Sequence, residues 1–132
     1  MVLALSDTHA LLWYAFNDAR LSDAAGRLMD DAEASGDQVG ISAISLVEIV
    51  YLIEKRRIPA ESLDRVRSLF DQGGMLREVV VDRGVATSLA RVPRSEVPDM
   101  PDRIIAATAL HLGVPLISRD GKIRASSVRT IW

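Results

Sequence analysis

Four acidic residues stand at positions from which a metal-binding or catalytic site could be built: Asp7, Glu48, Asp102 and Asp120. Asp7 and Asp120 each follow a short apolar run that predicts a buried strand. Asp102 begins an apolar helical pattern, and Glu48 lies one turn into another. In a parallel sheet, strand exits and helix entries share one edge, where ligands bind. We therefore expect these four carboxylates to converge.

Converging carboxylates need a cation. Two like charges about 4 Å apart repel by roughly 4 kcal/mol at an effective dielectric near 20. Ligands that are all oxygen favour Mg²⁺ or Mn²⁺ over zinc. A divalent ion held in this way can activate water and stabilise a leaving oxygen, which is the chemistry of phosphodiester cleavage.

Each acid also has a purely structural interpretation. Asp7 could simply cap the helix that follows it. Glu48 lies three residues after Ser45, which is the spacing of a capping box. Against this, the neighbours of Glu48 are apolar, and a carboxylate on so apolar a helix needs a partner. Both interpretations stay open for these two residues.

Asp99, Asp102, Asp120 and Asp82 also lie at the ends of predicted helices or strands. Asp99 and Asp102 are three residues apart at a helix start, where acids favour the helix dipole. Asp120 precedes Gly121 in an ordinary turn signal. Asp82 follows a strand, and for this residue we favour a cap alone.

The elements that must position these acids alternate between strand and helix. Apolar runs predict strands at residues 2–5, 39–41, 76–81, 114–117 and 128–132. Helical patterns cover residues 8–16, 22–35, 46–57, 59–72, 84–91 and 103–112, with a short helix before the last strand. This order predicts an α/β fold with a parallel sheet of about five strands and helices on both faces. No linker or repeat divides the chain, so we expect a single domain over residues 1–132.

Composition excludes several classes of function. The chain has 132 residues and no cysteine, which excludes disulfides, thiol catalysis and thiolate zinc sites. No apolar run approaches the about 18 residues of a membrane span, and no signal peptide precedes the first strand, so we expect no membrane association and a cytoplasmic protein. The net charge of −2 provides no global attraction for nucleic acid. A local basic cluster, Arg119, Lys122 and Arg124, lies beside the proposed site and could hold phosphate.

Four stretches of the chain closely resemble the PIN domain, and most nearly the VapC-type toxins of bacterial toxin–antitoxin pairs. They are LSDTHALLW at 5–13, ISAISLVE at 41–48, DRIIAATA at 102–109 and ISRD at 117–120. The resemblance covers almost the whole chain in the right order. It implies a parallel sheet between helices and a ribonuclease that depends on Mg²⁺ or Mn²⁺.

The resemblance also assigns roles to residues. It implies that the four acids of the family fall on Asp7, Glu48, Asp102 and Asp120, with Asp99 as a further possible metal ligand. It places the small assisting hydroxyl on Ser118, where threonine is more usual. Related toxins often carry His-Arg-Asp-Pro before the third acid, whereas only the aspartate of that stretch is present here.

The sequence is thus interpreted as an endoribonuclease toxin of a type II toxin–antitoxin system. The resemblance implies a cognate antitoxin, an RNA substrate and a homodimer. The apolar Trp13, Tyr14, Leu52 and Ile53, which exceed what one small core needs, also favour a dimer. Two alternatives are a non-catalytic binding module with the same fold and a PIN nuclease outside any toxin–antitoxin system, acting on RNA, DNA or flap structures. Cleavage of RNA that EDTA abolishes would exclude the binding module.

Overall fold

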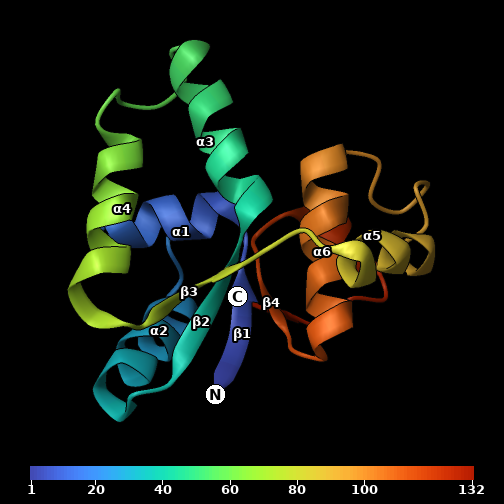
Figure 1. The fold of residues 1–132 in the computed structure, drawn as a ribbon, viewed down its shortest axis with the longest axis horizontal. Helices are drawn as coiled ribbons and strands as arrows, with labels where there is room; N and C mark the ends of the chain where they lie inside the picture. Colours follow the sequence, from blue (N-terminus) through green and yellow to red (C-terminus); the bar gives the residue numbers. More distant parts are fainter.

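Five parallel strands form one sheet in the order β3-β2-β1-β4-β5 (Figure 1). The computed structural model describes all 132 residues. The strands are β1 (Val2–Ser6), β2 (Gln38–Ser42), β3 (Leu76–Val79), β4 (Leu116–Ile117) and β5 (Thr130–Ile131). The helices are α1 (Thr8–Ala15), α2 (Asp23–Ser35), α3 (Ala43–Glu54), α4 (Ser62–Gly73), α5 (Arg83–Ser88), α6 (Met100–Leu112) and α7 (Gly121–Ala125), with a 3₁₀ turn, η1 (Leu89–Arg91), after α5. The predicted α/β architecture is confirmed.

Helices cover both faces of the sheet, because successive strand residues point to opposite sides. In β1, Ala4 belongs to a core with α1, α2, α3 and α4, whereas Leu5 belongs to a second core with α6 and α7. In β4, Ile117 and Leu116 divide between the two cores in the same way. All four of these side chains are fully buried. The two cores clamp the central strands and hold their carboxyl ends in place.

Several boundaries differ from those predicted. Helix α3 ends at Glu54, before the basic run that was expected to finish it, and Arg56 has a positive φ of 57°. Helix α4 begins at Ser62 instead of Pro59, whose carbonyl accepts the Ser62 N–H at 3.1 Å. Helix α6 begins at Met100, before the predicted start at residue 103, so Pro101 lies in the first helical turn. A proline is tolerated there because its missing N–H would have no helical partner.

The outermost strands are shorter than the apolar runs that predicted them. Strand β3 ends at Val79, and Val80 and Val81 are exposed beyond it. Strand β5 is limited to Thr130–Ile131. None of the helices has the length and apolar character needed to cross a membrane.

Candidate active site

The site lies where the sheet changes its direction of growth. From β1 the chain adds β2 and β3 on one side, and later adds β4 and β5 on the other. In open α/β sheets, ligands bind in the crevice beyond the carboxyl ends of the strands at such a switch point. The Asp7 N–H donates to the Ile117 carbonyl at 3.0 Å, which extends the β1–β4 pairing by one residue. Asp7 is therefore fixed at the mouth of this crevice.

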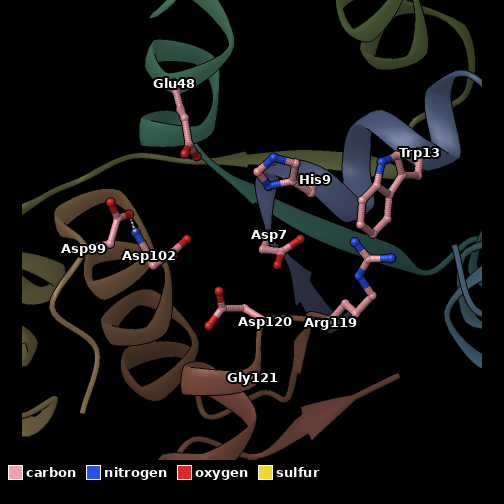
Figure 2. A pocket seen from close by; sticks show the side chains of 9 residues that line it. All are labelled: Asp7, His9, Trp13, Glu48, Asp99, Asp102, Arg119, Asp120 and Gly121. Carbon is pink, nitrogen blue, oxygen red and sulfur yellow. Dashed lines mark hydrogen bonds between the residues drawn. The ribbon is translucent and has the colours of Figure 1, made fainter. Parts of the chain in front are cut away.

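A cavity of about 500 Å³ at this edge collects the predicted acids (Figure 2). It is lined by five carboxylates together with His9, Trp13, Arg119 and Gly121; the five are Asp7, Glu48, Asp99, Asp102 and Asp120. Figure 2 shows the acids arriving from separate elements, with Glu48 on α3 and Asp99 and Asp102 at the start of α6. The structure thus brings together all four acids singled out by the sequence, together with Asp99, the further ligand that the resemblance suggested.

Three of these acids also cap helices. Asp7 Oδ1 accepts the Ala10 N–H at 2.8 Å, and Asp99 Oδ2 accepts the Asp102 N–H at 3.2 Å. Asp120 Oδ1 accepts two N–H groups at the start of α7, both at 3.0 Å. The structural interpretation of these acids is therefore correct as far as it goes. The same three acids cap helices and also line the pocket.

The capping-box interpretation of Glu48 is wrong. The cap of α3 is Ser42, whose hydroxyl accepts the Ile44 N–H at 3.2 Å. The Ser45 hydroxyl accepts a hydrogen bond from Thr8 at 3.0 Å, and Glu48 Oε1 is buried with no hydrogen-bond partner. A buried carboxylate oxygen without a partner is costly. A cation or a hydrogen-bond donor in this pocket would therefore stabilise the Glu48 carboxylate.

Burial and mutual repulsion raise the pKa of two of the acids. Burial raises the pKa of Asp7, which is only 6% exposed, and the negative charge of Glu48 adds to this effect. Hydrogen bonds from Ser118 and Ala10 and the nearby His9 act in the opposite direction. Burial, followed by repulsion from Asp99, Asp120, Glu48 and Asp7, raises the pKa of Asp102 to about 7. The carboxylates are therefore close enough for the negative charge of one to disfavour ionisation of another.

These properties fit a divalent cation. The donors are all carboxylate oxygens, which suit Mg²⁺ or Mn²⁺, and a cation would satisfy the orphaned oxygen and offset the repulsion. No group of three or more acidic or histidine side chains is already gathered tightly enough to hold an ion. Ion binding would therefore draw these side chains further together.

Buried hydroxyls support the acids from below, and the sequence identified only one of them. Ser118 is fully buried; its hydroxyl accepts the Asp120 N–H at 3.1 Å and hydrogen-bonds the Asp7 carboxylate. The Thr8–Ser45 hydrogen bond, which was not predicted from the sequence, ties the start of α1 to the helix that carries Glu48. The sequence marked Thr8 and Ser45 only as small polar residues next to apolar helical patterns.

Arg103, next to Asp102 in the sequence, does not belong to the site. Its guanidinium donates to the carbonyls of Val92 and Leu89, at 2.8 and 3.0 Å. It ties the start of α6 to the segment after α5. The pocket therefore keeps its negative charge on this side.

Comparison with known proteins agrees with this geometry. The model of the PIN domain family matches residues 4–127. The chain belongs to the PIN domain family. The family membership predicted from the four motifs is thus confirmed.

Three individual proteins show the extent of the similarity. The chain is 30% identical over 125 residues to Ribonuclease VapC22 of Mycobacterium tuberculosis, covering 95% of this chain and 92% of that one. Its fold is similar to a DNA-bound VapBC structure from Salmonella typhimurium, with a TM-score of 0.74, 19% identity, and coverage of 99% and 98% of the two chains. A toxin–antitoxin complex from Klebsiella pneumoniae gives a TM-score of 0.61 at 25% identity, with 98% and 96% coverage. The similarity therefore spans nearly the whole of each chain.

Proposed function

We propose that this PIN domain, comprising residues 1–132, is a VapC-like endoribonuclease and the toxin of a type II toxin–antitoxin pair. The observation that carries the proposal is the acid pocket at the switch point of a chain 30% identical, over nearly its full length, to a VapC ribonuclease. A non-catalytic binding module would have no use for a buried, unpartnered oxygen of Glu48 beside two carboxyl groups whose pKa values are raised.

In this proposal Asp7, Glu48, Asp102 and Asp120 hold one or two Mg²⁺ or Mn²⁺ ions, with Asp99 as a further ligand. When bound, such an ion supplies a water nucleophile at neutral pH and positive charge for the leaving oxygen. The chain itself supplies the positions of the ligands. Asp7 and Asp120 are fixed by their helix caps, and Ser118 bonds both residues. Asp102 would release its proton when the ion binds, so affinity for the ion should rise with pH.

A cognate antitoxin is the expected protein partner. The structures similar to this chain include a VapBC complex and a toxin–antitoxin complex. The pocket is open and acidic, so an inhibitor must neutralise several carboxylates at once. An arginine suits this task, because its planar fork can pair with carboxylates in two places.

A homodimer also forms part of the proposal, but its support differs from what the sequence indicated. Trp13 is buried, and Leu52 and Ile53 pack against the core, so these residues do not form a free surface. Three exposed apolar residues lie instead on one face of α3: Val47, Val50 and Tyr51, which are 49%, 39% and 58% exposed. Their spacing of three and four residues forms a continuous stripe that a second copy could cover.

The decisive experiment incubates the purified protein with total RNA, with and without Mn²⁺, and maps the cleavage ends. We expect cleavage that requires Mn²⁺ or Mg²⁺ and stops with EDTA. Asp7→Asn should abolish cleavage while the protein stays folded, because asparagine can still cap α1. Asp31→Asn, the same change on an exposed face of α2, is the matched control and should cleave normally. Intact RNA under all conditions would favour the binding module.

Expression in cells separates the toxin from a nuclease with another role. Production of the parent chain should arrest growth, and co-production of the small protein encoded next to it should restore growth. The Asp7→Asn chain should not arrest growth. Normal growth despite abundant chain that cleaves RNA in vitro would contradict the toxin assignment and leave the nuclease.

A further inference from the structure

Among the arginines and lysines of the chain, one lines the acid pocket itself. Arg119 lines the cavity beside five carboxylates. An RNA phosphate approaching such a cavity is repelled unless positive charge offsets the acids. Bound divalent ions would act on the phosphate being cleaved, but a strand also has flanking phosphates that must be held. Arg119 is exposed at the rim and is placed to meet one of them.

The Arg119 side chain is held by Trp13. Its guanidinium carbon lies 4.5 Å from the centre of the Trp13 ring, within the range of a cation–π contact. Figure 2 shows this pair on the side of the pocket opposite Glu48 and Asp102. Trp13 is only 7% exposed, and the centre of its ring lies 5.8 Å from that of Trp132 in an edge-on arrangement. A rigid ring therefore fixes the position of a flexible cation.

Arg119 differs from the second arginine on the same ring. Arg20 lies 5.2 Å from the Trp13 ring centre, but Asp18 accepts hydrogen bonds from its Nη2 and Nε at 2.7 and 3.1 Å. Arg119 takes part in none of the three ion pairs of the chain. Its guanidinium donors are thus free for a ligand, whereas those of Arg20 are largely used within the protein.

The shape of the surface gives a strand a route past Arg119. A second cavity of about 500 Å³ shares His9, Trp13 and Glu48 with the acid pocket. It continues to Leu52 and Ile58 and is more apolar than the first. A strand whose scissile phosphate lies among the acids can thus pass over Trp13 into this second cavity, and its next phosphate would meet Arg119.

We propose that Arg119, positioned by Trp13, forms a phosphate subsite that binds a phosphodiester of single-stranded RNA next to the one being cleaved. This inference rests on the proposed ribonuclease function. The guanidinium fork can donate two parallel hydrogen bonds to one phosphate, which fixes the register of the strand relative to the acids. Arg119 is a binding residue in this proposal, and Trp13 is its positioning residue.

The test measures RNA binding without cleavage. A short fluorescein-labelled single-stranded RNA of mixed sequence is titrated with the Asp7→Asn protein in Mg²⁺, and anisotropy gives Kd between about 50 and 200 mM salt. Adding Arg119→Gln should weaken binding roughly tenfold at low salt. It should also reduce the slope of log K against log salt by about 0.7, the value for one phosphate contact in a single strand.

Matched variants make the result specific. Arg119→Lys keeps the charge but loses the fork, so it should restore the salt slope with only part of the affinity. Arg67→Gln removes the same charge from a 71% exposed side chain on α4 and should change neither quantity. In the otherwise unmodified enzyme, Arg119→Gln should raise KM more than it lowers kcat.

The outcomes separate the subsite from the function. The subsite is wrong if Arg119→Gln binds RNA with the same Kd and salt slope as Arg67→Gln while the parent protein cleaves RNA. The ribonuclease function, and the subsite with it, is wrong if the parent binds RNA in Mg²⁺ or Mn²⁺ but leaves it intact.

Discussion

Replacing Asp102 with asparagine should make the metal-free protein more stable at pH 8. The pKa of Asp102 is about 7, against an ordinary value of 3.8, because burial and the charges of neighbouring acids disfavour its ionised form. The Asp102 carboxylate makes none of the side-chain hydrogen bonds of the site, whereas Asp7, Asp99 and Asp120 each cap a helix. Asparagine at position 102 therefore removes a repelled charge without removing a bond.

The sign and the size of the effect follow from linkage. Because the folded pKa is raised, the folded protein keeps a proton that the unfolded chain has already lost between about pH 4 and 7. The associated stability is fully present below the unfolded pKa and is lost as the pH rises through about 7. The difference between the two pKa values corresponds to at most about 4 kcal/mol, at 1.36 kcal/mol for each factor of ten in acidity. The pocket is open to solvent, so we expect about 1–2 kcal/mol after screening.

The assay is urea unfolding in EDTA at pH 5 and pH 8. At pH 8, Asp102→Asn should raise the free energy of unfolding by about 1–2 kcal/mol, and the gain should shrink at pH 5. Asp31→Asn should change stability at neither pH. Saturating Mg²⁺ should then stabilise the parent more than the variant, because the variant has lost a ligand for the ion. Equal gains at both pH values, or a gain no larger than that of Asp31→Asn, would show that the acids do not repel one another as the structure indicates.

Two further predictions concern the support of the site and the assembly of the chain. Ser118→Ala removes the hydroxyl that bonds Asp7 and accepts the Asp120 N–H, and we expect kcat/KM to fall about 10–100-fold, as for other residues that orient metal ligands; unchanged kcat/KM would show that the acids position themselves. Tyr51→Lys places a charge in the exposed apolar stripe of α3, so light scattering should report a dimer for the parent and a monomer for the variant. A parent that is already monomeric at micromolar concentration would contradict the dimer.

Much of the fold was predictable because local signals and tertiary structure agree. Asp82 was expected to cap a helix, and Ser22 begins the helical pattern predicted over residues 22–35; their side chains accept the N–H groups of Val85 and Ala25. Gly113 directly follows the helical pattern predicted over residues 103–112, and it ends that helix with a φ of 70°, in the left-handed region that glycine adopts readily. The alternation of strands and helices is then compatible with only a few ways of connecting the strands in one sheet. Convergence of the acids followed from that alternation together with the parallel order of the strands.

The features that were not predicted depend on which face of each helix packs against the rest of the protein. The periodicity of the sequence alone does not show this. Helix α3 is apolar on several sides, so its sequence did not show that Ile49 is buried while Tyr51 is exposed. Trp13 was expected at an interface, but Trp132, far away in the sequence, closes over it. Its contact with Arg119 likewise joins residues separated by most of the chain. Such pairings exist only after the sheet has formed.

The caps also show why the structural and functional interpretations of an acid need not compete. Asp120 uses Oδ1 for two backbone N–H groups of α7, and Oδ2 makes none of the hydrogen bonds of the structure. One oxygen thus fixes the side chain while the other is available to a cation, and the cap holds the ligand in place before any ion binds. Asparagine would preserve the capping oxygen while removing the charge, whereas alanine would remove both. Asp120→Asn and Asp120→Ala should therefore lose Mg²⁺ affinity to a similar extent, while only Asp120→Ala should lose stability, by about 1 kcal/mol. Equal stability of the two variants would show that the cap contributes nothing and that the position of Asp120 is set by β4 alone.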